Sequence, residues 1–164
     1  MNARRLVAAV AAGSVSWFVL VVLSPRLSPV LAAAVYAVGS LICHQRPERS
    51  FHWDGAQLAV CARCTGIYLG ACVTAVLAFV PPRRYARQVV EPRRLRRGLA
   101  AAAVPTAVTV LAEWAGWWQP SANVRAVTGV LLGAAAGFVV AAALHYGECL
   151  PRAAAGPSPP HTPI

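Results

Sequence analysis

The chain has 164 residues, of which 58% are hydrophobic and only 12% are charged, whereas a typical globular protein has about 25% charged residues. This shortage of polar surface weighs against a soluble enzyme and against a disordered chain. All fifteen basic residues are arginine, and the formal net charge is +10. The arginines gather beside apolar stretches, so we expect a lipid bilayer and no nucleic acid as the partner of this charge.

Four apolar stretches are long enough to cross a bilayer, which takes roughly 20 predominantly apolar residues. They cover residues 6–23, 57–80, 98–118 and 124–146. Each stretch must be helical in lipid, because no water is present to satisfy the backbone. A fifth stretch, 29–42, would extend only about 21 Å as a helix. It is too short for a hydrocarbon core of about 30 Å, so we expect a short interfacial or re-entrant helix there.

The arginines predict the orientation. The loop 81–97 holds seven of them, and short arginine-rich loops stay cytoplasmic. Arg4 and Arg5 favour a cytoplasmic N-terminus as well, and both conditions hold if 29–42 does not span. We therefore predict four spans with both termini cytoplasmic, the first span being a retained signal anchor. The alternative is five spans with an exoplasmic N-terminus.

The predicted fold class is all-α: a polytopic membrane helix bundle of four transmembrane helices plus one short helix. Residues 1–150 form one domain in this prediction. The tail, 151–164, is rich in proline and alanine, and it has too little apolar content to pack, so we expect it to be disordered.

Cysteines and histidines near the second span predict a metal site. Cys61 and Cys64 are three residues apart, which on a helix would put both on one face. Thiolates at this spacing suit zinc or another thiophilic ion, with Cys43 and either His44 or His52 completing a tetrahedral set. A thiol–disulfide redox pair and a structural disulfide remain open.

Two cofactors are not expected. The residue after Cys64 is Thr65, whereas covalent attachment of haem c requires a histidine there. No phosphate-binding motif is present, so no nucleotide is expected.

A polar cluster is predicted at the same membrane face. The second and third spans form a hairpin around the arginine loop, so their other ends share a side, which the positive-inside rule makes exoplasmic. Arg63 and Glu113 should lie roughly 8–9 Å below the rim, where charges pair or line a cavity. We expect Glu113 to pair with Arg63 or Arg125. Ser121 and Asn123, which lie just before Arg125, join the cluster.

Glycines at four-residue spacing mark two of the spans. Gly66 and Gly70 lie in the second span, and Gly129, Gly133 and Gly137 lie in the fourth. This spacing lets helices approach closely in lipid. We expect packing within the chain first and a homo-oligomer second.

The motifs together resemble a family of small prokaryotic membrane proteins known as the domain of unknown function 2085. The resemblance covers roughly residues 30–145. It rests on Cys43-His44-Gln45, Arg49-Ser50-Phe51, Cys61-Ala62-Arg63-Cys64-Thr65-Gly66-Ile67-Tyr68-Leu69-Gly70, Ser121, Asn123, Arg125, Thr128-Gly129 and Gly133. It implies an integral membrane protein and supplies no reaction. Gln45 and Arg49 of these motifs are counted with the polar cluster.

Three functions are consistent with these residues. The first is an integral membrane protein whose exoplasmic Cys/His cluster binds a thiophilic metal ion. The second is a membrane thiol–disulfide protein that uses Cys61 and Cys64. The third is a non-enzymatic transport or interaction module, with Glu113 and Arg125 lining a polar path. Whether the chain is an enzyme stays open, because no Ser-His-Asp or paired-carboxylate motif is present.

Overall fold

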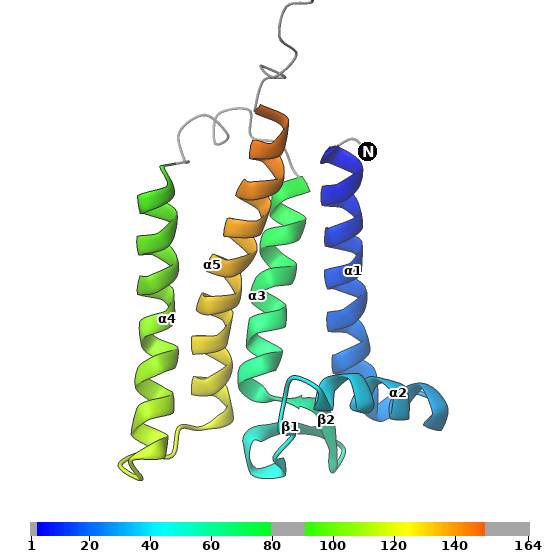
Figure 1. Cartoon of the computed structure of the whole chain (residues 1–164). Coiled ribbons are helices and arrows are strands. Elements are labelled where there is room, and N and C mark those ends of the chain that lie inside the picture. The colour runs from blue at the N-terminus through cyan, green and yellow to red at the C-terminus, as the bar shows by residue number, and fades with distance from the viewer. Residues whose placement is uncertain (1–2, 80–90, 150–164) are drawn as a thin grey trace, which may run out of the picture.

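The computed structural model describes residues 3–79 and 91–149. Four long helices run side by side, and a short helix and a small hairpin cover one end of the bundle (Figure 1). The predicted tail 151–164 and the arginines of the loop at positions 83, 84 and 87 lie outside the described residues.

The long helices are α1 (Ala3–Leu23), α3 (Ala62–Phe79), α4 (Pro92–Trp114) and α5 (Ala122–Cys149). Three of them, α1, α4 and α5, contain segments long and apolar enough to cross a membrane. Helix α3 is apolar but shorter, with 18 residues. Large apolar side chains remain exposed on the helices, for example Val104, Val108 and Leu111 along one side of α4, as expected of a surface that faces lipid.

The predicted span 57–80 is wrong in its first part. Ala56–Cys61 forms strand β2, which pairs antiparallel with β1 (Ser50–Trp53), so the fold is not purely helical. The turn between them is Asp54-Gly55, and both residues have positive φ, 51° and 83°. An Asp-Gly pair is favoured in two-residue hairpin turns because it tolerates this backbone conformation. The helix therefore begins only at Ala62.

The predicted short helix is α2 (Pro29–Ser40), which lies across the end of the bundle in Figure 1. Hydrogen bonds attach it to the hairpin. The Tyr36 hydroxyl donates to the Gln57 carbonyl oxygen. Gln45 Nε2 donates to the Tyr36 carbonyl oxygen at 2.8 Å and to the Ala59 carbonyl oxygen at 2.7 Å. The side chain of Gln45 thus joins α2 to β2.

The buried core of this end lies between α1, the hairpin and α3. Val21, Cys43 and Val60 form its centre. A 3₁₀ turn, η1 (Ser24–Arg26), follows α1, and the buried Ser24 Oγ accepts a hydrogen bond of 3.0 Å from the Ala59 backbone N–H. A second 3₁₀ turn, η2 (Pro47–Arg49), precedes the hairpin. These contacts fix the loop that carries Cys43 against β2.

Helices α3 and α5 are in backbone contact. A Cβ atom added at Gly66 would lie 2.0 Å from the carbonyl oxygen of Ala126, and one added at Gly133 would lie 2.0 Å from that of Ile67. Only glycine fits at such distances. The other glycines of the two stripes, Gly70, Gly129 and Gly137, face the same contact.

Candidate metal centre and the charged cluster beside it

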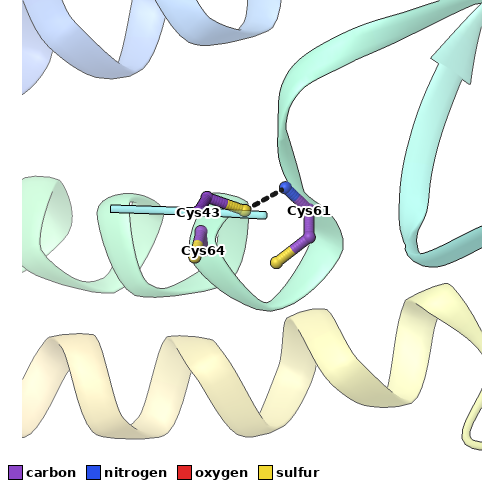
Figure 2. Close-up of side chains that lie close together, drawn as sticks. All are labelled: Cys43, Cys61 and Cys64. Carbon is purple, nitrogen blue, oxygen red and sulfur yellow. Dashed lines mark hydrogen bonds between the residues drawn. The ribbon is translucent and has the colours of Figure 1, made fainter. Parts of the chain in front are cut away.

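Three cysteines from three different parts of the chain meet beside the first turn of α3. Cys43 follows α2, Cys61 is the last residue of β2, and Cys64 lies in the first turn of α3. Their sulfur atoms all lie within 4.8 Å of one another (Figure 2). Two thiolates that share one zinc ion, each at about 2.3 Å from it, lie about 3.8 Å apart. The cluster is therefore of the size that a single ion needs.

The surroundings hold this geometry. Cys43 is buried, while Cys61 and Cys64 are half-buried. The Cys61 backbone N–H donates to Cys43 Sγ at 3.2 Å. All three cysteines are free, so the structure contains the thiols and not a disulfide between them.

The strand–helix junction, and not one helical face, brings the CxxC pair together. Cys61 ends the strand and Cys64 enters the helix after it, so the chain changes direction between the two residues. The expectation that both residues lie on one helix was wrong, because the hairpin turn at Asp54-Gly55 keeps 56–61 extended.

Neither predicted histidine lies with the cysteines in the structure. His44 and His52 are both exposed, and the group of potential ligands found within the described residues consists of the cysteines alone. The hairpin register explains the case of His52. It pairs with Gln57, whereas Ser50 pairs with Cys61, so His52 lies about 13 Å along the strands from Cys61, at about 3.3 Å per residue.

Neighbouring groups change the pKa of the Cys61 thiol. A hydrogen bond from Cys64 lowers the pKa of Cys61 to about 5, and a smaller contribution from Cys43 acts in the same direction, while burial opposes them. A thiol with this pKa is a thiolate at neutral pH. The thiolate is the form that binds metal and that attacks a disulfide.

On the other side of α3, three arginines surround one carboxylate. Glu113 lies near the end of α4, and its side chain is buried. Arg125 Nη2 and Arg49 Nε each lie 2.9 Å from Glu113 Oε1. Arg63 Nη2 lies 3.5 Å from Glu113 Oε2. The expected partner was Arg63 or Arg125; the structure brings both to Glu113, together with Arg49.

These charges lie at the ends of their helices. Arg63 is the second residue of α3 and Glu113 the second-last of α4, so neither charge lies five or six residues inside its helix, as the predicted depth assumed, and the depth in the membrane stays a prediction. The reason is that residues 57–61 form a strand and that α4 ends at Trp114. The start of α3, the end of α4 and the start of α5 lie together, as predicted. Arg125 Nη1 also donates to the Glu48 carbonyl oxygen at 3.4 Å, which connects the start of α5 to the segment before the hairpin.

The remaining polar residues act locally. Ser121 Oγ accepts from the Val124 N–H at 3.4 Å at the start of α5, and Asn123 is exposed in the same turn. Gln45 joins α2 to β2. The predicted polar cluster thus divides into one charged group around Glu113 and separate structural contacts.

Two contacts were not anticipated. Thr109 Oγ1 accepts from Arg63 Nη2 at 3.3 Å. Thr109 precedes Glu113 by four residues, and this helical spacing could have placed it on the same face. Arg26 lies over the Trp53 ring, 4.8 Å from its centroid, and pairs with Asp54. No local pattern predicts that contact, since Arg26 and the hairpin are distant in sequence.

The apolar helices and the charged group at their ends define the class of this molecule: a helical integral membrane protein. More narrowly, the chain belongs to the family of predicted membrane proteins called the domain of unknown function 2085, whose model matches residues 43–139. This match confirms the resemblance seen in the motifs.

Two archaeal relatives are uncharacterized proteins. One, from Methanocaldococcus jannaschii, is 53% identical over 47 residues, which cover 29% of this chain and 30% of the relative. The other, from Methanothermobacter thermautotrophicus, is 49% identical over 49 residues, which cover 30% of this chain and 44% of the relative. The chain thus matches less than half the length of either relative. No solved structure matches the chain.

Proposed function

We propose that this chain is a multi-pass membrane protein that binds one thiophilic metal ion, zinc or a similar ion, through Cys43, Cys61 and Cys64. The observation that carries the proposal is the approach of three free sulfur atoms to within 4.8 Å of one another. The segment after α2, strand β2 and helix α3 each supply one thiol, and a hydrogen bond and the packed core hold the thiols in place.

The ligand set suggests what the ion does. Soft thiolate ligands select ions such as zinc and Cu(I). A structural zinc site closes with four protein ligands, whereas a site with three keeps one position open. With three cysteines and no histidine, the proposed site has room for a water molecule, an exchanging ligand or a substrate. The proposed ion is therefore exchangeable or reactive and not purely structural.

The proposed membrane placement has four spans. Helix α3 has 18 residues, which reach about 27 Å, close to the thickness of the hydrocarbon core. It runs beside α1 and α5, and α2 lies across one end of the bundle (Figure 1). This arrangement favours four spans over five. The arginines of 81–97 then orient the cysteines toward the exoplasm and both termini toward the cytoplasm.

A second candidate is thiol–disulfide exchange, favoured by the lowered pKa of Cys61. In that reaction Cys61 and Cys64 would form a disulfide, and an external disulfide would take up the two electrons and two protons. The third sulfur in contact with both makes the metal site the better explanation, because three thiols in one cluster exceed what a redox pair requires.

Metal analysis separates these candidates. We expect about one equivalent of zinc or copper per chain in protein purified in detergent with a reductant and without chelators. Cys43→Ser, Cys61→Ser and Cys64→Ser should each lose most of this metal. Cys72→Ser is the matched control, because Cys72 lies in α3 outside the cluster, and it should keep the metal.

A metal content near zero in the wild-type chain, before and after incubation with zinc or Cu(I), would contradict the proposal. Thiol trapping then tests the alternative. A reductant-sensitive disulfide between Cys61 and Cys64 would support redox exchange, whereas thiols that stay open to alkylation with and without reductant would exclude it.

A further inference from the structure

The charged group around Glu113 holds more positive charge than it neutralises. Arg49, Arg63 and Arg125 all contact this one carboxylate, which leaves two positive charges in excess. The other ion pairs found among the described residues, Arg26–Asp54, Arg46–Glu48 and Arg94–Glu91, include none of these three arginines.

The excess charge is largely removed from water. The side chains of Arg125 and Arg63 are 5% and 17% exposed, and that of Arg49 is 33% exposed. The Nε atoms of Arg63 and Arg125 are buried and have no hydrogen-bond partner within the described part of the chain. Each guanidinium offers five N–H donors, so one carboxylate, one threonine hydroxyl and one carbonyl oxygen leave many donors free. Buried charges without a counterion are unfavourable.

We propose that Arg49, Arg63 and Arg125 form a binding site for a phosphate-type oxyanion. Two excess positive charges match a doubly charged phosphate group, and its oxygens suit the planar fork of guanidinium donors. Arg63 and Arg125 also lie in the first turns of α3 and α5, where the helix dipoles add to the attraction. Glu113 aligns the three arginines. The anion enters from the side of the partly exposed Arg49.

This site is separate from the proposed metal site. Arg63 turns toward Thr109 and Glu113 of α4, whereas Cys64 packs against the core formed by Val21, Cys43 and Val60. The two clusters lie on different sides of the first turn of α3. None of Arg49, Arg63 and Arg125 is a proposed metal ligand.

The phosphate group could belong to free phosphate or to a lipid headgroup, since the site lies at the end of the bundle. Two titrations distinguish these sources. Wild-type protein in phosphate-free maltoside detergent is titrated with inorganic phosphate and, separately, with dihexanoyl phosphatidic acid. Binding is measured by calorimetry and by the shift of the unfolding temperature. Sodium chloride at equal ionic strength and dihexanoyl phosphatidylcholine serve as controls.

We expect saturable binding of inorganic phosphate, of dihexanoyl phosphatidic acid or of both, with no matching response to either control. Arg49→Gln should weaken this binding tenfold or more. Arg46→Gln is the matched control, because Arg46 lies on the same loop and its side chain is 57% exposed, and it should bind as the wild type does.

Two outcomes would overturn the proposal. The first is the absence of saturable phosphate-specific binding in the folded wild-type chain, which requires no variant to fold. The second is equal affinity in the Arg49→Gln and Arg46→Gln variants, which would reduce the arginines to a structural ion-pair group.

Discussion

At the scale of single residues, Glu113 has the largest structural role in the charged group. It is the only acidic side chain that the described residues bring to Arg49, Arg63 and Arg125. Without its charge, three guanidiniums would face one another at the junction of α3, α4 and α5. Mutual repulsion and desolvation would then act against the folded state.

Glu113→Gln should therefore destabilise the protein by about 3 kcal/mol or more, as is usual when one partner of a buried ion pair is removed. The control is Glu91→Gln, whose exposed carboxylate pairs with Arg94 at 3.4 Å and should matter by less than about 0.5 kcal/mol. The measurement is reversible unfolding in detergent, in the absence of phosphate. Equal stability of the two variants would show that Glu113 does not hold the arginines together.

Sequence reasoning could find most members of this group but not its full geometry. Arg63 and Glu113 stand out as charges in apolar stretches, and Arg125 lies at the start of the last predicted span, which chain topology brings beside them. The contact between Arg49 and Glu113 joins residues far apart in the sequence, so no local spacing predicts it. The CxxC spacing indicates Cys61 and Cys64 as candidate ligands. The distance of His52 from these cysteines depends on the hairpin register, which the spacing does not give.

At the scale of elements, the long apolar stretches predicted helices, and the strands were missed. AQLAV of β2 is apolar and continues directly into the apolar sequence of α3, so hydropathy alone merges them into one span. The Asp54-Gly55 pair was the available signal for a hairpin. The ends of α4 and α5 also differ from the predicted spans, since polar residues such as Arg93 and Arg94 extend α4 beyond its apolar part.

The contact between α3 and α5 predicts an unequal response to alanine. Gly133→Ala should destabilise the bundle markedly, by more than about 2 kcal/mol, because its Cβ would lie 2.0 Å from the Ile67 carbonyl oxygen and would force the helices apart. Gly13→Ala in α1 is the control. No atom lies within 4 Å of a Cβ there, so alanine should be neutral or slightly stabilising. Unfolding in detergent compares them, and matching results would argue against close backbone packing.

At the scale of the whole molecule, the two clusters lie at one end of the bundle, and the arginines at the start of α4 lie at the other end. The hairpin and α2 cover the end that carries Cys61 and Glu113, and the start of α4 lies at the other end (Figure 1). By the positive-inside rule, the end with the arginines is predicted to face the cytoplasm and the cluster end the exoplasm. A metal ion or a phosphate group that binds at the cluster end would then come from the exoplasm. The orientation therefore decides which compartment supplies the ligand in both proposals.

The absence of lysine from the sequence allows this orientation to be measured with single added amines. His52→Lys places one in the hairpin, and Arg96→Lys places one at the start of α4; both positions are exposed. A membrane-impermeant amine reagent should label the lysine at 52 in intact cells and the lysine at 96 only after permeabilisation, as read by mass spectrometry of each peptide. The reverse pattern would show that the orientation is opposite to the predicted one and that both clusters face the cytoplasm. Labelling of both positions in intact cells would mean that the bundle does not separate them across the bilayer, because a spanning bundle must leave one end inaccessible.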